Sequence, residues 1–263
     1  MICGMPDLFL ELRDERGEGE APPEPLADAE AVAFLATAGF SGMRLIPWGS
    51  NYSFAVALED EDGRAQMAVY KPESGEAPLY DFPPGTLHRR ETAAYVLDAL
   101  LGWGLVPPTV IRDGPHGVGS VQLYVEPEAG EPEADPRVTW GDTTIELERL
   151  VLFDHLANNA DRKLSHCLRD SRGKIWGIDH GLTFNVEPKL KTVLWQFVEC
   201  PIRPELMDDL IALRINEPVL RDVMEALLEP AEVTALLARV DRFIDTGRYP
   251  RLNPHRNIPY GWW

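Results

Sequence analysis

The hydrophobic positions of the chain follow two different periods. In the first half, short apolar or alternating runs are separated by turn-forming residues, which is typical of strands. In the second half, apolar residues recur mostly every three or four positions, which is typical of helices. The pattern predicts an α+β fold, with an antiparallel sheet followed by a mainly helical part. Strands are predicted at 43–46, 53–58, 65–71 and, as a pair, within 106–125, and helices at 27–39, 87–102, 143–157, 204–213, 218–228 and 231–246.

Two polar tracts divide the chain. Residues 11–26 are dense in Glu, Pro and Gly, and such tracts tend to stay loose, so 1–26 is predicted to be a flexible N-terminal arm. A second tract, 126–136, is acidic and rich in proline, which favours a boundary between two lobes. The sequence therefore predicts an N-lobe at 27–128 and a C-lobe at 129–263.

Composition argues against several classes of partner and location. A net charge of -18 and a pI near 4.7 disfavour binding to nucleic acid or to an anionic membrane surface. No apolar run approaches the ~20 residues needed to cross a bilayer, and the chain start has no signal-peptide pattern. The three cysteines have no metal-site spacing. We therefore expect a cytoplasmic protein without a membrane segment, and we expect the apolar Trp262-Trp263 end to dock on the body or on a protein partner.

Two aspartates lie in local settings that suit catalysis. A predicted helix runs into residues 158–163, Asn-Asn-Ala-Asp-Arg-Lys, where the adjacent Asn residues favour a helix end and a turn. Asp161 is therefore predicted to lie in a loop directly after a helix. Residues 167–178 are predicted to form a hairpin, which places Asp179 at the end of a mostly buried strand. Gly181 follows it and allows a sharp turn.

Helix, loop with Asp, hairpin and strand-end Asp is the order of parts in kinase-like phosphotransferases. Residues 158–163 and 177–181 (Gly-Ile-Asp-His-Gly) resemble the catalytic and metal loops of the phosphatidylinositol 3- and 4-kinase family. The similarity is greatest to its small actinobacterial members and extends more distantly to bacterial HipA-type kinases. The resemblance implies a two-lobed protein-kinase-like fold that binds ATP and Mg2+, with Mn2+ as an alternative. It also implies that Asp161 orients the acceptor hydroxyl and that Asp179 ligates the metal.

The two loops depart from the family pattern at two positions. The family usually carries Asp-Arg-His, and here Lys163 stands in place of that His. The family then has an Asn five residues after the Asp, a position that His166 occupies here. Because Mg2+ prefers oxygen ligands, His166 is a candidate metal ligand with a structural role as the alternative.

A lysine and a glutamate upstream fit the same scheme. Lys71 ends an apolar strand, and a buried lysine is costly unless it is paired. It either reaches water from an edge or binds nucleotide phosphates, and its position before Asp161 and Asp179 favours the phosphates. Glu91 lies on the apolar face of the helix predicted at 87–102. As the corresponding Glu does in the family, it is predicted to pair with Lys71, the alternative being a surface pair with a nearby Arg.

Two further segments would complete a nucleotide site. Gly49, Ser50 and Asn51 form the turn between the first two strands, where their backbone N–H groups would face phosphate oxygens, although an ordinary hairpin uses the same residue types. In kinase-like folds the last strand of the N-lobe leads to a hinge whose backbone holds the adenine ring. The residues in that place are Gln122, Leu123, Tyr124, Val125 and Glu126.

The sequence therefore predicts an ATP- and Mg2+-dependent phosphotransferase that acts on a hydroxyl acceptor. A protein or a small molecule is favoured over a phosphoinositide, because the basic residues near the C-terminus are too scattered to form a headgroup patch. Two alternatives stay open. The chain is a pseudokinase that serves as a nucleotide-binding scaffold, or it is an adenylyl transferase that binds the nucleotide inverted on the same fold.

Overall fold

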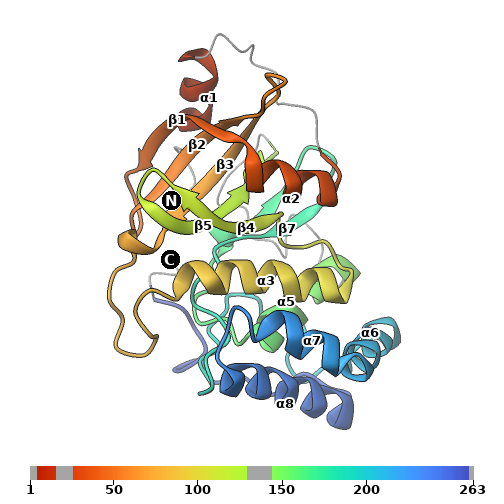
Figure 1. The fold of residues 1–263 in the computed structure, drawn as a ribbon. Coiled ribbons are helices and arrows are strands. Elements are labelled where there is room, and N and C mark those ends of the chain that lie inside the picture. Colours follow the sequence, from red (N-terminus) through yellow and green to blue (C-terminus); the bar gives the residue numbers. More distant parts are fainter. Residues whose placement is uncertain (1–4, 16–25, 129–143, 261–263) are drawn as a thin grey trace.

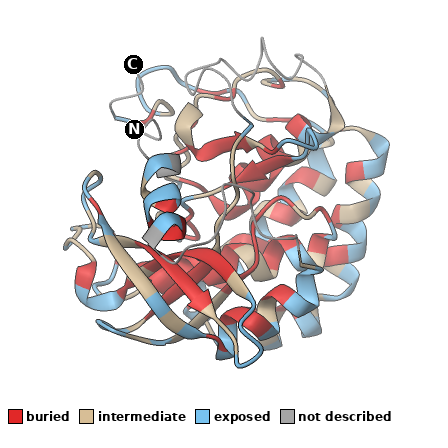
Figure 2. Ribbon diagram, turned by 90° about the horizontal axis from the view of Figure 1, so that it is seen from above, coloured by how far each residue is buried: buried red, intermediate tan, exposed pale blue. Residues whose placement is uncertain are grey.

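The computed structural model describes residues 5–15, 26–128 and 144–260. A five-stranded antiparallel sheet lies on one side of the molecule and a group of helices on the other, with helix α3 (Leu87–Leu101) between them (Figure 1). Buried residues run through the strands and along the inward sides of the helices (Figure 2). The predicted α+β architecture with a sheet lobe and a helical lobe is confirmed. No helix within these described ranges has the length and apolar character needed to span a membrane.

The sheet has the strand order β1-β2-β3-β5-β4. Ala55 pairs with Val69 and Ala57 pairs with Met67, so these four side chains share one face of the sheet. Lys71 is two residues beyond Val69 and belongs to that same face. The strands are β1 (Gly39–Ile46), β2 (Ser53–Glu59), β3 (Ala65–Pro72), β4 (Thr109–Gly114) and β5 (Gly117–Leu123).

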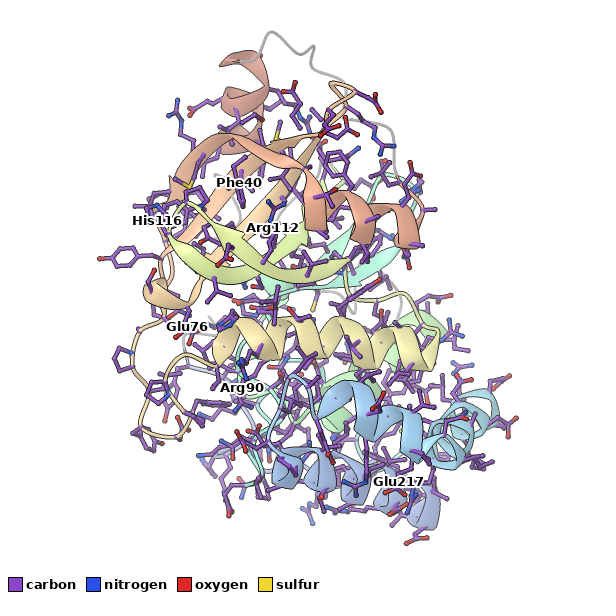
Figure 3. All side chains as sticks on the ribbon, viewed as in Figure 1. Phe40, Glu76, Arg90, Arg112, His116 and Glu217 are labelled. Atoms are coloured by element: carbon purple, nitrogen blue, oxygen red, sulfur yellow. The ribbon has the colours of Figure 1, made fainter. Side chains whose placement is uncertain are left out.

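Helix α2 (Asp28–Thr37) covers the opposite face of the sheet, where Phe34 and Leu35 pack among buried strand residues. The helix ends before Gly39, which was predicted to close it and instead begins β1. The reason is tertiary, because Arg112 of β4 donates hydrogen bonds to the carbonyls of Leu35 and Ala38, at 2.8 and 2.7 Å. Its guanidinium also lies over the Phe40 ring (Figure 3).

Helix α1 (Met5–Glu15) differs from the loose arm predicted for 1–26. Phe9 and Leu12 are three residues apart, so they share a helix face, and both are 1% exposed against the face of the sheet that carries Lys71. The apolar sheet surface supplies the partner that stabilises this short helix, which the polar composition of the tract did not predict. The remaining parts of the predicted arm, 1–4 and 16–25, lie outside the described residues.

The helical lobe packs around α5 (Ile145–Ala157), whose residues from Leu150 to Ala157 are all buried. Its N-cap is Thr144, whose side chain accepts a hydrogen bond from the Leu147 N–H at 3.2 Å. The sequence predicts Asp142 as a plausible N-cap of this helix, and that residue lies outside the described residues. The surrounding elements are the hairpin β6 (Cys167–Arg169) and β7 (Ile175–Gly177) and helices α6 (Pro204–Ile215), α7 (Glu217–Met224) and α8 (Pro230–Thr246).

The predicted limits of the lobes stay predictions, because most of the tract at 126–136 falls in the part of the chain that is not described. The Trp262-Trp263 end also lies outside the described residues, so its expected docking partner remains a hypothesis. Of the three cysteines, Cys167 and Cys200 are free thiols, and Cys3 is not among the described residues.

His155 is a buried histidine of α5, and its pKa allows the packing of the helical lobe to be tested. Its ring lies edge-on to Phe243 at 5.6 Å and is also in contact with Tyr249, so His155 is part of the core of this lobe. Burial lowers the pKa of His155 to about 3. Below pH 6.5, His155 binds a proton in the unfolded chain but stays neutral in the native state. The free energy of unfolding therefore falls as the pH drops. Between pH 7.5 and 4.5, the free energy of unfolding of the wild type should fall by about 2 to 3 kcal/mol more than that of His155→Phe.

The measurement is urea unfolding at the two pH values. His255 is exposed, so His255→Phe is the matched control and should keep the wild-type dependence on pH. Parallel pH profiles for the wild type and His155→Phe would contradict the assignment of this histidine as a buried neutral group.

Candidate active site

Lys71 and Glu91 meet at the border between the two lobes. The Lys71 ammonium forms a short ion pair with Glu91 Oε1 and a hydrogen bond with Asp179 Oδ1 at 2.9 Å. The three residues come from β3, from α3 and from the loop after β7. The structure therefore brings together three side chains that the sequence predicted to meet, and the alternative surface pairing of Glu91 is not observed.

The pKa shifts follow from this arrangement. Burial alone would lower the pKa of the Lys71 ammonium, but the carboxylates of Asp179 and Glu91 outweigh it and raise that pKa. The same lysine holds the pKa of Asp179 well below its usual range. Burial raises the pKa of Glu91, and Lys71 opposes that rise. The Lys71 ammonium therefore lies between two carboxyl groups, and it favours the ionised form of Asp179 in particular.

Glu91 also fixes the backbone that carries Asp179. Its Oε2 accepts a hydrogen bond from the His180 N–H at 2.9 Å. A Cβ at Gly181 would lie 3.4 Å from Glu91 Oε1, an ordinary van der Waals distance, so this loop passes close to the glutamate without depending on glycine. Asp179 itself has a φ of 61°, a left-handed conformation that Asp tolerates better than most residues. One glutamate thus positions both the ammonium and the loop of the second aspartate.

Asp161 lies in a loop that two asparagines hold in place. Asn159 Oδ1 accepts a hydrogen bond from the Asp161 N–H at 2.9 Å, and Lys163 Nζ donates one to Asp161 Oδ2 at 2.7 Å. Asn158 ends α5 in the left-handed conformation and donates to the carbonyls of Asn185 and Glu187. Burial raises the pKa of Asp161, and Lys163 opposes the rise. The adjacent asparagines predicted this turn correctly.

Arg162 anchors the loop from beneath, and the sequence analysis gave it no role. Its side chain is fully buried, and it forms a bidentate pair with Asp154 at 2.8 Å for both contacts. It also donates to the carbonyls of His166 and Ile178, at 2.9 and 3.0 Å, and its Nη2 lies 2.8 Å from His180 Nε2. A signal for this network existed in the sequence, because Asp154 interrupts an apolar helix run and a buried carboxylate needs a cation.

His166 lies beside Asp179, with Nε2 at 3.3 Å from Asp179 Oδ2. Burial lowers the pKa of His166 to about 4, so the ring is neutral at pH 7. Its Nδ1 is buried without a hydrogen-bond partner among the described residues, whereas a metal-bound histidine usually donates a hydrogen bond through its second nitrogen. The ring can reach a metal at Asp179, but it is not oriented as an established ligand would be.

A small cavity of about 70 Å³ joins these groups. Of the residues predicted from sequence, Ser50, Asn51, Lys71, Glu91, Asp161 and Asp179 line it. The remaining predicted site residues, which are Gly49, His166 and residues 122–126, are absent from the cavity wall as far as the structure is described. Lining residues that the sequence did not indicate as site residues are Tyr52, Pro72, Glu76, Leu87, His88 and Leu182.

The predicted hinge residues are instead occupied by protein contacts. Gln122 is buried, and its side chain donates a hydrogen bond to Thr109 Oγ1 at 2.9 Å. The Tyr124 N–H donates to the carbonyl of Met67 at 2.9 Å, and its ring stacks on Phe9 of α1. Glu126 forms an ion pair with Arg13, also of α1. The segment has the predicted place at the end of β5, and α1 covers it.

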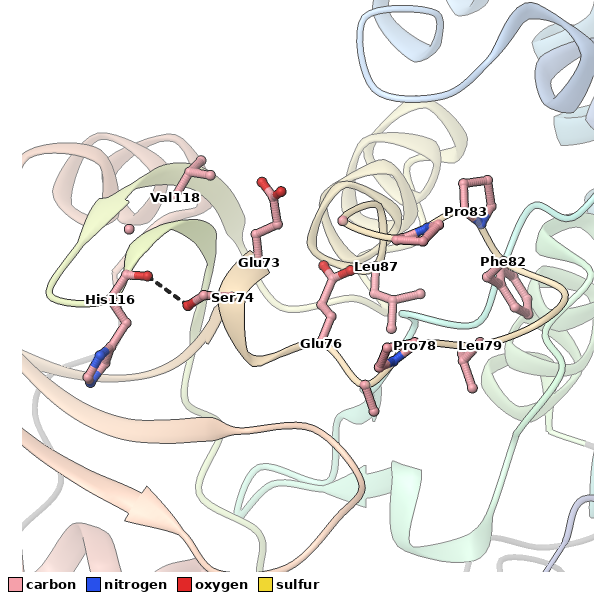
Figure 4. Close-up of a pocket in the computed structure, with 14 residues that line it drawn as sticks. Glu73, Ser74, Glu76, Pro78, Leu79, Phe82, Pro83, Leu87, His116 and Val118 are labelled. Atoms are coloured by element: carbon pink, nitrogen blue, oxygen red, sulfur yellow. Dashed lines mark hydrogen bonds between the residues drawn. The ribbon is translucent and has the colours of Figure 1, made fainter.

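A larger cavity of about 380 Å³ lies next to the small one and shares Glu76 and Leu87 with it. Figure 4 shows its wall, which residues 73–87 form with the turn between β4 and β5. Glu76 lies where the sheet lobe meets the first turn of α3 (Figure 3), and its Oε1 accepts hydrogen bonds from both the N–H and the ring of His88. Glu76 therefore holds the start of the helix that carries Glu91.

Solved structures share this fold, and one of the two described next is a kinase by name. The structure of hydra Fam20 with sugar has a TM-score of 0.58 at 16% identity, over 82% of this chain and 87% of that chain. The Golgi casein kinase with Mn/ADP bound has a TM-score of 0.53 at 14% identity, over 83% and 74% of the two chains. Identities this low show the fold alone. They confirm the two-lobed kinase-like fold that the sequence predicted.

The sequence comparisons place the chain more narrowly. No protein-family model matches it. Protein Rv2133c of Mycobacterium tuberculosis (strain ATCC 25618 / H37Rv) is 37% identical to it over 231 residues, which is 75% of this chain and 83% of that protein. The chain belongs to the family of Rv2133c.

Proposed function

We propose that the protein is an ATP- and divalent-metal-dependent phosphotransferase that moves the γ-phosphoryl group to a hydroxyl acceptor. The observation that carries this proposal is the convergence of Lys71, Glu91, Asp161 and Asp179 on one cavity between the lobes. Phosphoryl transfer needs positioning and charge neutralisation more than covalent chemistry from the protein, and these four groups can supply both. The loops that resemble phosphatidylinositol 3- and 4-kinases contribute Asp161 and Asp179.

The residues present fit a nucleotide and a divalent cation. The Asp179 side chain is 50% exposed toward the cavity, so its carboxylate oxygens can ligate Mg2+ or Mn2+. The adjacent Lys71 ammonium would neutralise phosphate oxygens, and Glu91 keeps it in position. The bound metal and ATP would supply the activated phosphoryl group. His166 is a second metal contact in this proposal, with nitrogen as its donor atom.

Asp161 would orient the acceptor hydroxyl and accept its proton. The carboxylate lies on the cavity wall, and Lys163 occupies its Oδ2. Oδ1 then remains the oxygen that can face an acceptor. Because burial raises the pKa of Asp161, the carboxylate is a stronger base than an exposed aspartate would be. Lys163 keeps it ionised and can approach the transferred group from the same side.

The acceptor in this proposal is a protein or a small molecule. A phosphoinositide headgroup needs several uncommitted cations, and the loop after Asp179 carries only Lys189 and Lys191. Lys189 pairs with Asp81 at 2.9 Å, and Lys191 lies 4.1 Å from the centre of the Tyr260 ring. Both lysines are therefore engaged, and the strongly acidic chain adds no attraction for an anionic membrane surface.

A nucleotide-binding scaffold without transferase activity is the second candidate. The observation that favours it is His166 at the position where the resembled kinases carry Asn, with its Nδ1 unsatisfied. An adenylyl transferase would use the same residues with the nucleotide inverted. Mass spectrometry of the products after incubation of a proteome and a metabolite extract with ATP separates the three, because it detects phosphorylated products, adenylylated products or neither.

The first test concerns Asp161. Asp161→Asn keeps the size of the side chain but removes the base, so turnover should fall by about 10² to 10⁴. Nucleotide affinity should stay within about twofold, because Asp161 would face the acceptor and not the phosphates. Single-turnover phosphoryl transfer and binding of a fluorescent ADP analogue measure the two quantities. Undiminished turnover would remove Asp161 from the mechanism.

The second test concerns Asp179. Asp179→Asn should abolish the part of nucleotide binding that depends on Mg2+ or Mn2+, because the carboxylate would be the principal metal ligand. Calorimetry with ADP, carried out with Mn2+ and with EDTA, isolates that part. Asp81→Asn is a matched control, since Asp81 also pairs with a lysine but lies outside the small cavity. Metal-dependent ADP binding that survives in Asp179→Asn would count against the proposed site.

The third test uses the neighbour of Asp161. Lys163 opposes the raised pKa of Asp161, so Lys163→Met should raise that pKa further. The base is active when ionised, and the acid limb of the profile of kcat against pH should therefore move to higher pH. Lys189→Met removes another paired lysine and should leave the limb in place. A limb that moves to lower pH in Lys163→Met would contradict the assigned role.

A further inference from the structure

Helix α1 covers the face of the sheet on which a nucleotide base would lie. Ala55 and Val69 are paired across β2 and β3, and Val69 is two residues before Lys71 on the same face. A triphosphate held by Lys71 places its ribose and base farther along this face, toward the end of β5. That surface is apolar and small, with Ala55 and Ala57 on β2, and it could accept a flat ring.

The side chains that cover this surface come from α1. Phe9 and Leu12 are each 1% exposed and form one apolar cluster with Ala55, Ala57 and Val69. The helix packs on β1 and β2, and a Cβ atom at Gly42 of β1 would lie only 3.2 Å from Leu12 Cδ2. The absence of a side chain at position 42 therefore allows α1 to lie directly on the sheet.

The same helix binds the predicted hinge. The Phe9 ring stacks on Tyr124 with ring centres 3.6 Å apart and an angle of 23° between the planes. Arg13 Nη2 lies 3.2 Å from Glu126 Oε2. An aromatic ring that lies between the sheet face and residues 124–126 has the surroundings of a kinase-bound base. This explains why the small cavity reaches Lys71 and Asp179 but not the hinge.

We propose that α1 is an autoinhibitory plug in which Phe9 takes the place of the nucleotide base, so that a nucleotide binds only when α1 leaves the sheet. This inference rests on the proposed nucleotide-dependent function. In the structure, the phosphate end of the site is formed and the base end is closed. Displacement of α1 would open the base end without rearranging Lys71, Glu91 or Asp179, since none of these contacts involves α1.

The interface between α1 and the rest of the protein buries polar atoms that have no partner in the described part of the chain, which suits a helix that can be displaced. Arg13 is 3% exposed, and its Nε and Nη1 have no hydrogen-bond partner among the described residues. Buried donors without partners are costly, and Glu126, the carboxylate that Arg13 pairs with among the described residues, has a side chain that is 37% exposed. The apolar contacts of Phe9 and Leu12 thus hold the helix on the sheet despite the free-energy cost of the unpaired Arg13 donors.

The test measures the affinity of the full-length protein for a fluorescent ADP analogue in the presence of Mn2+. Phe9→Ala/Leu12→Ala weakens the plug and should tighten binding by about tenfold or more, because a larger fraction of the protein is then competent to bind. Leu10→Ala is the matched control on the same helix, since Leu10 is 36% exposed, and it should bind as the wild type does.

A reversible lock provides the opposite perturbation. Leu12→Cys/Gly42→Cys places two thiols at adjoining positions of α1 and β1. Its oxidised form should bind the analogue at least tenfold more weakly than the wild type, and reduction should restore binding. Hydrogen exchange followed by mass spectrometry gives a readout independent of affinity, in which Mn2+ and ADP should speed the exchange of α1 amides in the wild type.

Equal affinities in the wild type, in Phe9→Ala/Leu12→Ala and in the oxidised lock would overturn the plug and leave the phosphotransferase proposal intact. Failure of the wild type and of the double Ala variant to bind any nucleotide, while both melt cooperatively, would overturn both. Faster exchange in α1 together with unchanged affinity in the lock would also reject the plug, because nucleotide would then bind with the helix in place.

Discussion

The candidate site depends on one partly buried ammonium and the two carboxyl groups that compensate it. Lys71 would be costly on an apolar strand without partners, and Glu91 and Asp179 come to it from a helix and from a loop of the other lobe. Because Glu91 also binds the His180 N–H, the same interaction fixes the loop that carries Asp179. The electrostatic requirement of one lysine thus couples the sheet, α3 and the helical lobe.

The loop that carries Asp161 relies on a buried charge of its own. Arg162 is fully buried and satisfied by Asp154, by two backbone carbonyls and by the His180 ring. These partners belong to α5, to the loop itself and to the segment that follows β7. Asp161, the neighbouring residue, is therefore held against the loop of Asp179 although 17 positions separate them in sequence. Rigid support of this kind is what positional catalysis requires.

The face of the sheet that carries Lys71 adds a second constraint, which is hydrophobic and not electrostatic. Ala55, Ala57 and Val69 leave an apolar surface that water disfavours, and Phe9 and Leu12 of α1 cover it. A nucleotide base could cover it equally well. Competition between a helix of the chain and a ligand for one apolar surface would give the protein a closed and an open form, with the charged end of the site common to both.

The sequence by itself determined the elements and the local chemistry. Apolar periodicity predicted the strands and helices, and the asparagines before Asp161 and the hairpin before Asp179 set both aspartates in loops, because these signals act within a few residues. Only the tertiary structure decided what depends on distant partners. The burial of Arg162, the early end of α2 at Arg112 and the contacts of α1 with the segment after β5 each involve a partner far along the chain. A polar tract such as 11–26 carries no local sign that Leu12 within it and Phe9 just before it will pack on an apolar sheet. Hydrophobic contact is non-directional and acts between residues at any separation in the sequence.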